Sequence, residues 1–390
     1  MKGLRFTLGV LAGTFLALPG MAADPLKIGF ITTLSGPAGY LGEDARDGFQ
    51  LAIALEGGKL GGTPIQLLIE DDQLKPVTGK QLADKFIKSD KAKIISGIIF
   101  SNVAVAAVPS ILESGAFFIS PNAAPSEFAG QGCNKNYFVV SWQNDNLHES
   151  AGKAAGDLGY KKMAILAPNY QAGKDALAGF RRYYKGEIVS EIYTKLDQTD
   201  FAPEIAQIRA AKPDAVFHFH PGGLGIAFTK QYIQAGLMKE IPLVAPMPSM
   251  ENRIMTAIGD ASIGIQSTSH WNQDFANEAN KKFMAEFQKK YNRVPTEYAQ
   301  QGYDAALLIA SALKAVGGDI SKEDKFREAL RKANFQSPRG AFKFASNQHP
   351  IQDWYARIVE KGADGKLMMK TLRKVFEGHV DAYAAECKMK

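Results

Sequence analysis

The sequence has 390 residues, of which 46% are hydrophobic and 22% are charged. Those proportions are typical of a globular protein and exclude extensive disorder, while the length exceeds what one hydrophobic core usually supports, so two domains are expected. The 46 basic and 40 acidic residues give a net charge of +6. Because this small excess is dispersed along the chain, it argues against a nucleic-acid or membrane-surface partner.

The first 23 residues have the pattern of a secretory signal peptide. Lys2 and Arg5 precede an apolar run from Leu8 to Leu18, and small residues then permit cleavage near residue 22 or 23. The apolar run is too short for a transmembrane helix. We therefore expect an exported protein whose mature chain begins near residue 24.

Strand and helix patterns alternate over the first part of the mature chain. Runs rich in β-branched and aromatic residues are separated by stretches with helical periodicity, such as Glu43–Glu56 and Val77–Ser89. This alternation predicts a parallel sheet covered by helices. The predicted strands are Leu26–Thr33, Ile65–Asp71, Lys93–Gly97, Phe117–Ser120 and Tyr137–Ser141.

The alternation then restarts, which predicts a second α/β lobe. Two long helical patterns follow it, and the tail then returns to strands, with Asp353–Val359 the clearest. A chain that crosses between two lobes more than once forms a hinge beside a cleft. The further predicted strands are Met163–Ala167, Ile188–Tyr193, Ala215–His220, Pro242–Ala245 and Gly264–Ser269. The further predicted helices are Lys174–Tyr184, Ala202–Ala211, Gly225–Gly236, Asn277–Tyr291 and Tyr298–Ala315.

The chain contains two cysteines, Cys133 and Cys387. In an oxidising compartment, a pair with no other partner favours a disulfide over two free thiols. Two isolated cysteines are too few for a zinc site. We therefore expect a bond that ties the C-terminal tail to the loop around residue 133.

Six segments of the mature chain match, in order, the motifs of one known family. They read KIGFITTLSGPAGYLGEDARDGFQLAI, IEDDQLKP, SGIIFSN, FFISPNAAPSEF, APNYQAGKDALAGF and GYDAALLIASAL. Each motif alone is weak, but the ordered set covers nearly the whole mature chain. On these motifs the sequence resembles the branched-chain amino-acid-binding proteins, a class of type I periplasmic binding proteins.

The resemblance implies an α/β fold of two Rossmann-like lobes with parallel central sheets, joined by a hinge of three crossovers. Lobe 1 would comprise residues 24–142 and 272–344, and lobe 2 residues 143–271 and 345–390 with the C-terminal tail. It further implies a periplasmic solute-binding component of an ABC importer. Such a protein captures a small molecule by hinge closure and presents it to the membrane permease subunits. We expect a monomer.

Family members grip a ligand carboxylate at positions that match residues near two strand ends. Ser101 follows a predicted strand and precedes the helical stretch Val103–Ser114, whose first N–H groups can hold an anion. The backbone of Asn122, Ala123 and Ala124 matches a second carboxylate contact. Tyr40 and Tyr170 match aromatic residues on opposite walls of the family's cleft. The alternatives are a plain helix cap for Ser101, and surface or core packing for the two tyrosines.

One departure from the family pattern bears on the ligand. Amino-acid-binding members place a Glu in a GPEG motif, where it neutralises the ligand ammonium; here the segment reads VAPMPSM, with Met247 at that position. An unpaired ammonium buried in a cleft costs several kcal/mol. We therefore expect a small carboxylate of the aromatic-acid type (benzoate, hydroxybenzoate or hydroxycinnamate), with a branched-chain amino acid or small amide as the alternative. The residues expected to surround it are Phe100, Trp142, His220, Met247 and Trp271, each of which could instead be core or hinge packing.

No motif of catalysis or of cofactor binding is present in the sequence. The glycines Gly36, Gly39 and Gly42 have the spacing GxxGxxG, which does not fit the dinucleotide-binding GxGxxG. His218 and His220 share a strand face but lack the acid or Cys neighbours of a metal site. We expect no enzymatic activity, no cofactor and no metal. A soluble partner of a separate sensor protein is the remaining alternative to transport.

Overall fold

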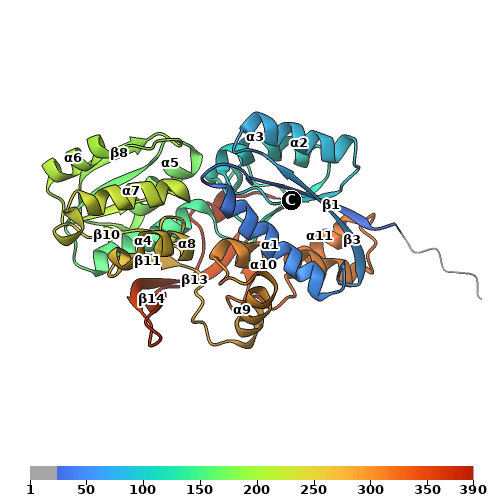
Figure 1. Ribbon diagram of the computed structural model, residues 1–390. Helices are drawn as coiled ribbons and strands as arrows, with labels where there is room; N and C mark the ends of the chain where they lie inside the picture. Colours follow the sequence, from blue (N-terminus) through green and yellow to red (C-terminus); the bar gives the residue numbers. More distant parts are fainter. Residues whose placement is uncertain (1–23, 390) are drawn as a thin grey trace, which may run out of the picture.

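The computed structural model describes residues 24–389, and the predicted signal peptide of residues 1–23 lies outside the described residues. Two lobes lie side by side, each with a central β-sheet and surrounding helices (Figure 1). The predicted two-lobed α/β fold is confirmed. In residues 24–389, no helix is long and apolar enough to cross a membrane.

The first lobe contains a six-stranded sheet in the order β2-β3-β1-β4-β5-β6. Its pairs are parallel, apart from the antiparallel β2–β3 hairpin. Strand β1 is buried from Ile28 to Thr32 without alternation, as expected for an interior strand covered on both faces. The strands are β1 (Leu26–Thr32), β2 (Lys59–Leu60), β3 (Thr63–Asp71), β4 (Ile94–Ser96), β5 (Phe117–Ser120) and β6 (Tyr137–Val139).

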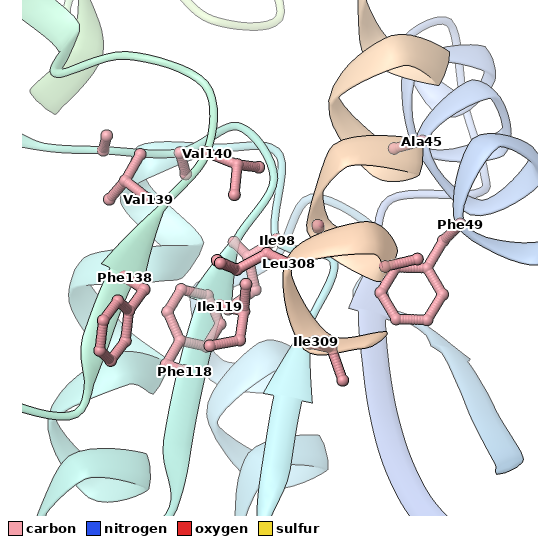
Figure 2. Close-up of a cluster of buried hydrophobic side chains, with 14 of the residues drawn as sticks. Ala45, Phe49, Ile98, Phe118, Ile119, Phe138, Val139, Val140, Leu308 and Ile309 are labelled. Carbon is pink, nitrogen blue, oxygen red and sulfur yellow. The ribbon is translucent and has the colours of Figure 1, made fainter. Parts of the chain in front are cut away.

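Helices from two distant parts of the chain cover this first sheet. Helix α10 packs along α1 although some 250 residues separate them, and Figure 2 shows Leu308 and Ile309 of α10 beside Ile119 of β5 and Phe49 of α1. The close approach of α1 and α10 requires glycine, because a Cβ on Gly48 would lie 1.8 Å from the Ala299 carbonyl oxygen. The helices are α1 (Gly39–Leu55), α2 (Pro76–Lys88), α3 (Ser101–Glu113), α9 (Glu278–Tyr291), α10 (Glu297–Val316) and α11 (Glu323–Lys332).

The second lobe repeats the architecture with a mixed sheet in the order β12-β13-β11-β10-β9-β7-β8. The strands from β7 to β11 pair in parallel, whereas β13 and β14 form a long antiparallel hairpin at one end of the sheet. The strands are β7 (Lys162–Pro168), β8 (Glu187–Thr194), β9 (Ala215–His218), β10 (Leu243–Val244), β11 (Gln266–Ser269), β12 (Lys343–Phe344), β13 (Pro350–Lys361) and β14 (Leu367–His379). The helices are α4 (Asn144–Asp157), α5 (Gln171–Tyr183), α6 (Ala202–Ala211), α7 (Gly223–Gln234) and α8 (Asn252–Ile258).

The chain passes between the lobes three times: after β6, after β11, and between α11 and β12. Two buried arginines tie these crossings together. Arg339 donates to the Asp304 carboxylate at 2.9 Å, to the Ser141 carbonyl at 3.2 Å and to the Gln352 side chain at 2.6 Å. Arg357 pairs with Glu297 of α10 and bonds Asn272 at 3.2 Å. Charged groups buried in this way are stable only when paired, so the crossings are held in a defined arrangement.

The predicted disulfide is present and joins Cys133 to Cys387. Cys133 lies in the loop between β5 and β6 of the first lobe. In the same tail, the Tyr383 hydroxyl donates to Asp145 of α4 in the second lobe at 2.8 Å. The C-terminal tail is therefore bonded to both lobes.

Candidate functional site

The strand orders of the two sheets bring three loops together. In each sheet the strand order changes direction at one point. This point lies between β1 and β4 in the first lobe, and between β7 and β9 in the second. Ligands of open α/β sheets bind outside the carboxyl ends of the strands at such a switch point. Ser101 follows β4, Tyr170 follows β7, and Phe219 follows β9. The switch points of the two lobes thus border one common space.

This space is a narrow cavity between the lobes, with a volume of about 20 Å³. Residues of both lobes line it, and aromatic and proline rings make up about half of them. A mainly apolar wall with a few polar groups is typical of small-molecule sites. The lining residues are Ile99, Phe100, Ser101, Asn122, Trp142, Asn144, Leu147, His148, Tyr170, Ala172, Phe219, Pro221, Pro248 and Tyr298.

Ser101 and Asn144 form a polar group in the cavity wall. The Asn144 amide donates to the Ser101 hydroxyl oxygen at 3.0 Å and to the Asp175 carboxylate at 2.9 Å. Because Ser101 accepts this bond, its own hydroxyl hydrogen is free for a ligand. Ser101 is also the first residue of α3, and within the described residues the N–H groups of Ser101 and Asn102 have no backbone acceptor, whereas those of Val103 and Ala104 donate to the Phe100 carbonyl oxygen. This part of the cavity can therefore donate several hydrogen bonds to an anion.

Aromatic rings form the walls around this polar group. Phe100 of the first lobe lies 6.4 Å from Tyr170 of the second, measured between ring centroids. Tyr170 in turn stacks on Phe219 at 6.3 Å with an angle of 11° between the planes. The Trp142 indole meets the edge of His270 at 5.4 Å, which fixes the orientation of its ring. A flat apolar group can lie against such surfaces.

The cavity lining, as far as residues 24–389 define it, contains no Asp, Glu, Lys or Arg. The nearby Asp175 carboxylate is buried behind Asn144 and Ser126, and burial raises its pKa to about 6. His148 does line the cavity, and burial lowers its pKa to about 3, so its ring is neutral at physiological pH. The site therefore provides hydrogen-bond donors for an anion but no countercharge for a cation.

Five of the residues predicted from the sequence line the cavity: Phe100, Ser101, Asn122, Trp142 and Tyr170. The three predicted residues Tyr40, Ala123 and Ala124 do not. Tyr40 instead donates its hydroxyl to Glu251 at 2.9 Å. The Ala123 N–H bonds the Ile98 carbonyl, and the Ala124 N–H bonds the Asn144 side chain. In this arrangement of the lobes, both backbone donors are thus satisfied within the protein.

The remaining three predicted residues, His220, Met247 and Trp271, are buried and do not line the cavity. His220 bonds the Thr194 hydroxyl at 3.1 Å, so it belongs to the core of the second lobe. The Trp271 indole donates to Asn280 at 2.8 Å. Met247 packs in the core that includes both lobes. For these three residues, the alternative of core or hinge packing describes their position.

Nine lining residues were not predicted. Phe219 and Pro221 flank the predicted His220. Strand β9 ends at His218, so both residues follow the end of the strand, where they line the cavity. Asn144, Leu147 and His148 share one face of α4, and the spacing of three and four residues is the signal that could have found them. Tyr298 lies in the first turn of α10, some 200 residues from the first-lobe loop that it meets. Only the folded chain brings it to the site.

Several contacts outside the cavity also join the two lobes. Arg253 of α8 pairs with Asp44 of α1 at 3.0 Å. The Ser126 hydroxyl donates to Asp175 of α5 at 2.7 Å. Gly223, the first residue of α7, lies against Pro37 so closely that a Cβ on it would lie 2.7 Å from the Pro37 Cβ. The lobes are thus in a closed arrangement around the cavity.

Comparison with known proteins agrees with this geometry. The family model described as "Periplasmic binding protein" matches residues 25–365. Leu/Ile/Val-binding protein homolog 6 of Brucella melitensis biotype 1 is 28% identical, over 95% of this chain and 96% of that relative. All these matches extend over both lobes.

Two solved structures are also similar. A solute-binding protein of an R. palustris ABC transporter, in complex with benzoate, is 33% identical, with a TM-score of 0.89 over 94% of this chain and all of that one. A second R. palustris solute-binding protein, in complex with 4-hydroxybenzoate, is 30% identical, with a TM-score of 0.84 over 91% of this chain and 98% of that one. The resemblance seen in the sequence motifs is confirmed, and the chain belongs to the periplasmic binding protein family as the solute-binding protein of an ABC transporter.

Proposed function

We propose that this solute-binding protein captures an aromatic monocarboxylate in the cavity between its lobes. One observation carries the proposal: an aromatic-walled cavity has hydrogen-bond donors at the start of α3 and no side-chain carboxylate in its described lining. The ligand carboxylate would accept from the Ser101 hydroxyl and from the free N–H groups of the first turn of α3. The ring would lie against Phe100 and Tyr170.

The missing carboxylate argues against an amino acid. A zwitterion would bring its ammonium into a cavity without a countercharge, at a cost of several kcal/mol. Two buried acids outside the lining do not offer one, since Asp175 accepts from Asn144 and Ser126, and Glu251 accepts from Tyr40 and from two backbone N–H groups of α8. Burial also raises the pKa of Glu251 to about 7, which disfavours its charged form. A monocarboxylate avoids this cost.

The proposed contacts are sufficient for a transport protein. A micromolar dissociation constant corresponds to roughly −8 kcal/mol. Hydrogen bonds to a charged group contribute about 1.5–3 kcal/mol each, and burial of one ring adds about 2–3 kcal/mol. Two or three such hydrogen bonds with the buried ring can reach that value after the ordering cost of binding is subtracted.

Capture requires the lobes to separate, because the closed arrangement covers the cavity. We propose that residues 24–142 with 272–344, and residues 143–271 with 345–390, are the two units that move about the three crossings. A ligand that bridges both lobes favours the closed form, and the permease subunits would recognise that form. We further propose that the protein is exported to the periplasm by its first 23 residues, acts as a monomer, and binds without catalysing a reaction.

A thermal-shift screen of the mature protein tests the ligand class. Benzoates and hydroxycinnamates are compared with leucine, valine and small amides. A ligand at about 100 times its dissociation constant adds about 2.7 kcal/mol, which raises the melting temperature by a few degrees. The proposal predicts a shift with aromatic acids and none with leucine or valine. A shift with leucine or valine alone would instead assign an amino-acid ligand.

A further inference from the structure

His148 lies in the first part of α4 and lines the ligand cavity. It is one helical turn from Asn144, so the two side chains share a face of the helix. Its side chain is 2% exposed. The ring meets Phe219, another lining residue, edge to face at a centroid distance of 4.8 Å, and Phe217 at 5.7 Å. These contacts hold the imidazole in one orientation at the cavity wall.

The imidazole of His148 differs from the other histidines in its hydrogen bonding. Its Nδ1 is buried and has no hydrogen-bond partner within residues 24–389. Each of the other five histidines bonds a neighbour through a ring nitrogen: His218, His220, His270, His349 and His379. A buried polar group without a partner is rare in native proteins and costs free energy. A ligand in the cavity can provide the missing partner.

We propose that His148 binds a hydroxyl group on the ring of the aromatic acid, so that the protein prefers hydroxylated ligands to benzoate. This inference rests on the proposed function. A neutral imidazole carries one N–H donor and one bare nitrogen acceptor, and a phenolic hydroxyl can both donate and accept. The match holds for either tautomer of His148.

The charge of the site selects a hydroxyl over other ring substituents. A second carboxylate beside His148 would be buried without a cation, because no Lys or Arg belongs to the described lining. An amino group that carries a charge meets the same obstacle. A phenolic hydroxyl is neutral at physiological pH and needs only a hydrogen-bond partner. His148 provides that partner, and the rings that it contacts, Phe217 and Phe219, offer none.

Calorimetric titration of the mature protein with benzoate, 3-hydroxybenzoate and 4-hydroxybenzoate tests the inference. The variants are H148F, which keeps a ring but removes both nitrogens, and H148Q, which restores a donor and an acceptor. The matched control is H218F: His218 is also buried in the second lobe with an unpartnered Nε2, but it does not line the cavity. Circular dichroism and the melting temperature establish that each variant folds.

The wild type is expected to bind at least one hydroxybenzoate about tenfold more tightly than benzoate, since one hydrogen bond separates the two ligands. H148F should abolish that preference, H148Q should restore part of it, and H218F should keep it whole. An equal loss for all three ligands in H148F, or an unchanged preference, would overturn the role of His148. A wild type that binds none of the three acids would overturn the proposed function itself.

Discussion

Replacing Gly223 with alanine tests whether ligand binding requires the closed arrangement of the lobes. Gly223 is the first residue of α7 in the second lobe, and Pro37 belongs to the loop before α1 in the first. A Cβ at position 223 would lie 2.7 Å from the Pro37 Cβ and 3.0 Å from the Pro37 carbonyl oxygen. Proline is rigid and carbonyl oxygens are fixed by the backbone, so neither atom can move away easily. The overlap exists only when the lobes are closed.

The magnitude follows from the cost of such an overlap. Inserting one methyl group into a well-packed contact costs about 1–3 kcal/mol, and each 1.4 kcal/mol is a factor of about ten in affinity. The dissociation constant of Gly223→Ala is therefore expected to rise by about 5- to 150-fold for every ligand that binds the wild type. In the open form the added methyl group meets nothing from the first lobe, so the melting temperature of the ligand-free protein should not fall.

Isothermal titration calorimetry measures the affinity, and small-angle X-ray scattering with saturating ligand measures closure. The matched control is Gly156→Ala, because Gly156 lies on the exposed surface of α4 and a Cβ there would meet nothing within 4 Å. This control should bind as the wild type does. A Gly223→Ala variant with wild-type affinity would refute the reasoning, since it would mean that ligand is held without contact between α7 and the first lobe.

Three further perturbations have defined outcomes. Ser101→Ala removes the hydroxyl proposed to hold the carboxylate. Calorimetry should show a 10- to 100-fold weaker affinity, because one hydrogen bond to a charged group contributes about 1.5–3 kcal/mol. An unchanged affinity would exclude that contact. Burial raises the pKa of Glu251 from 4.5 to about 7, so the stability that its protonation provides is complete below about pH 4.5 and is lost as the pH rises to about 7. The melting temperature of the wild type relative to Glu251→Gln should therefore fall between pH 5 and pH 8, and a constant difference would contradict the shifted pKa. The Cys133–Cys387 bond closes a loop across 254 positions, and its reduction should cost about 2–5 kcal/mol of stability. Thermal scans with and without reductant should therefore show a lower melting temperature for the reduced protein. Equal melting temperatures would show that the bond adds no stability.

Much of the fold could be predicted because most strands are buried on both faces. A continuous apolar run such as Phe117–Ser120 predicts a buried strand when helical patterns flank it. The structure has strand β5 at these residues. Strand β14 was not predicted, because only a few of its residues are buried and its lysines and arginines obscure the alternation. The partner that makes it a strand is β13, with which it pairs over nearly its full length. Pairing of that kind is tertiary information.

The site residues that could be predicted from the sequence are those that directly follow a strand. Phe100, Ser101 and Tyr170 come just after parallel strands, and such positions converge on the switch point of each sheet. The same rule failed at His220, because β9 ends at His218 and the cavity is reached by Phe219 instead. A shift of one residue moves a side chain to the opposite face of an extended chain. Tyr298 reaches the site from a helix that the local sequence does not connect with it.

The central claim is that the cavity binds an aromatic carboxylate and rejects an ammonium. Calorimetric titration of the mature wild-type protein with benzoate, with leucine and with 4-methylpentanoate tests it most directly, because the last two ligands differ only by the ammonium group. The account predicts tight binding of benzoate or a hydroxybenzoate, and weaker binding of 4-methylpentanoate that the added ammonium of leucine abolishes. Leucine that binds more tightly than 4-methylpentanoate and than the aromatic acids would contradict the account.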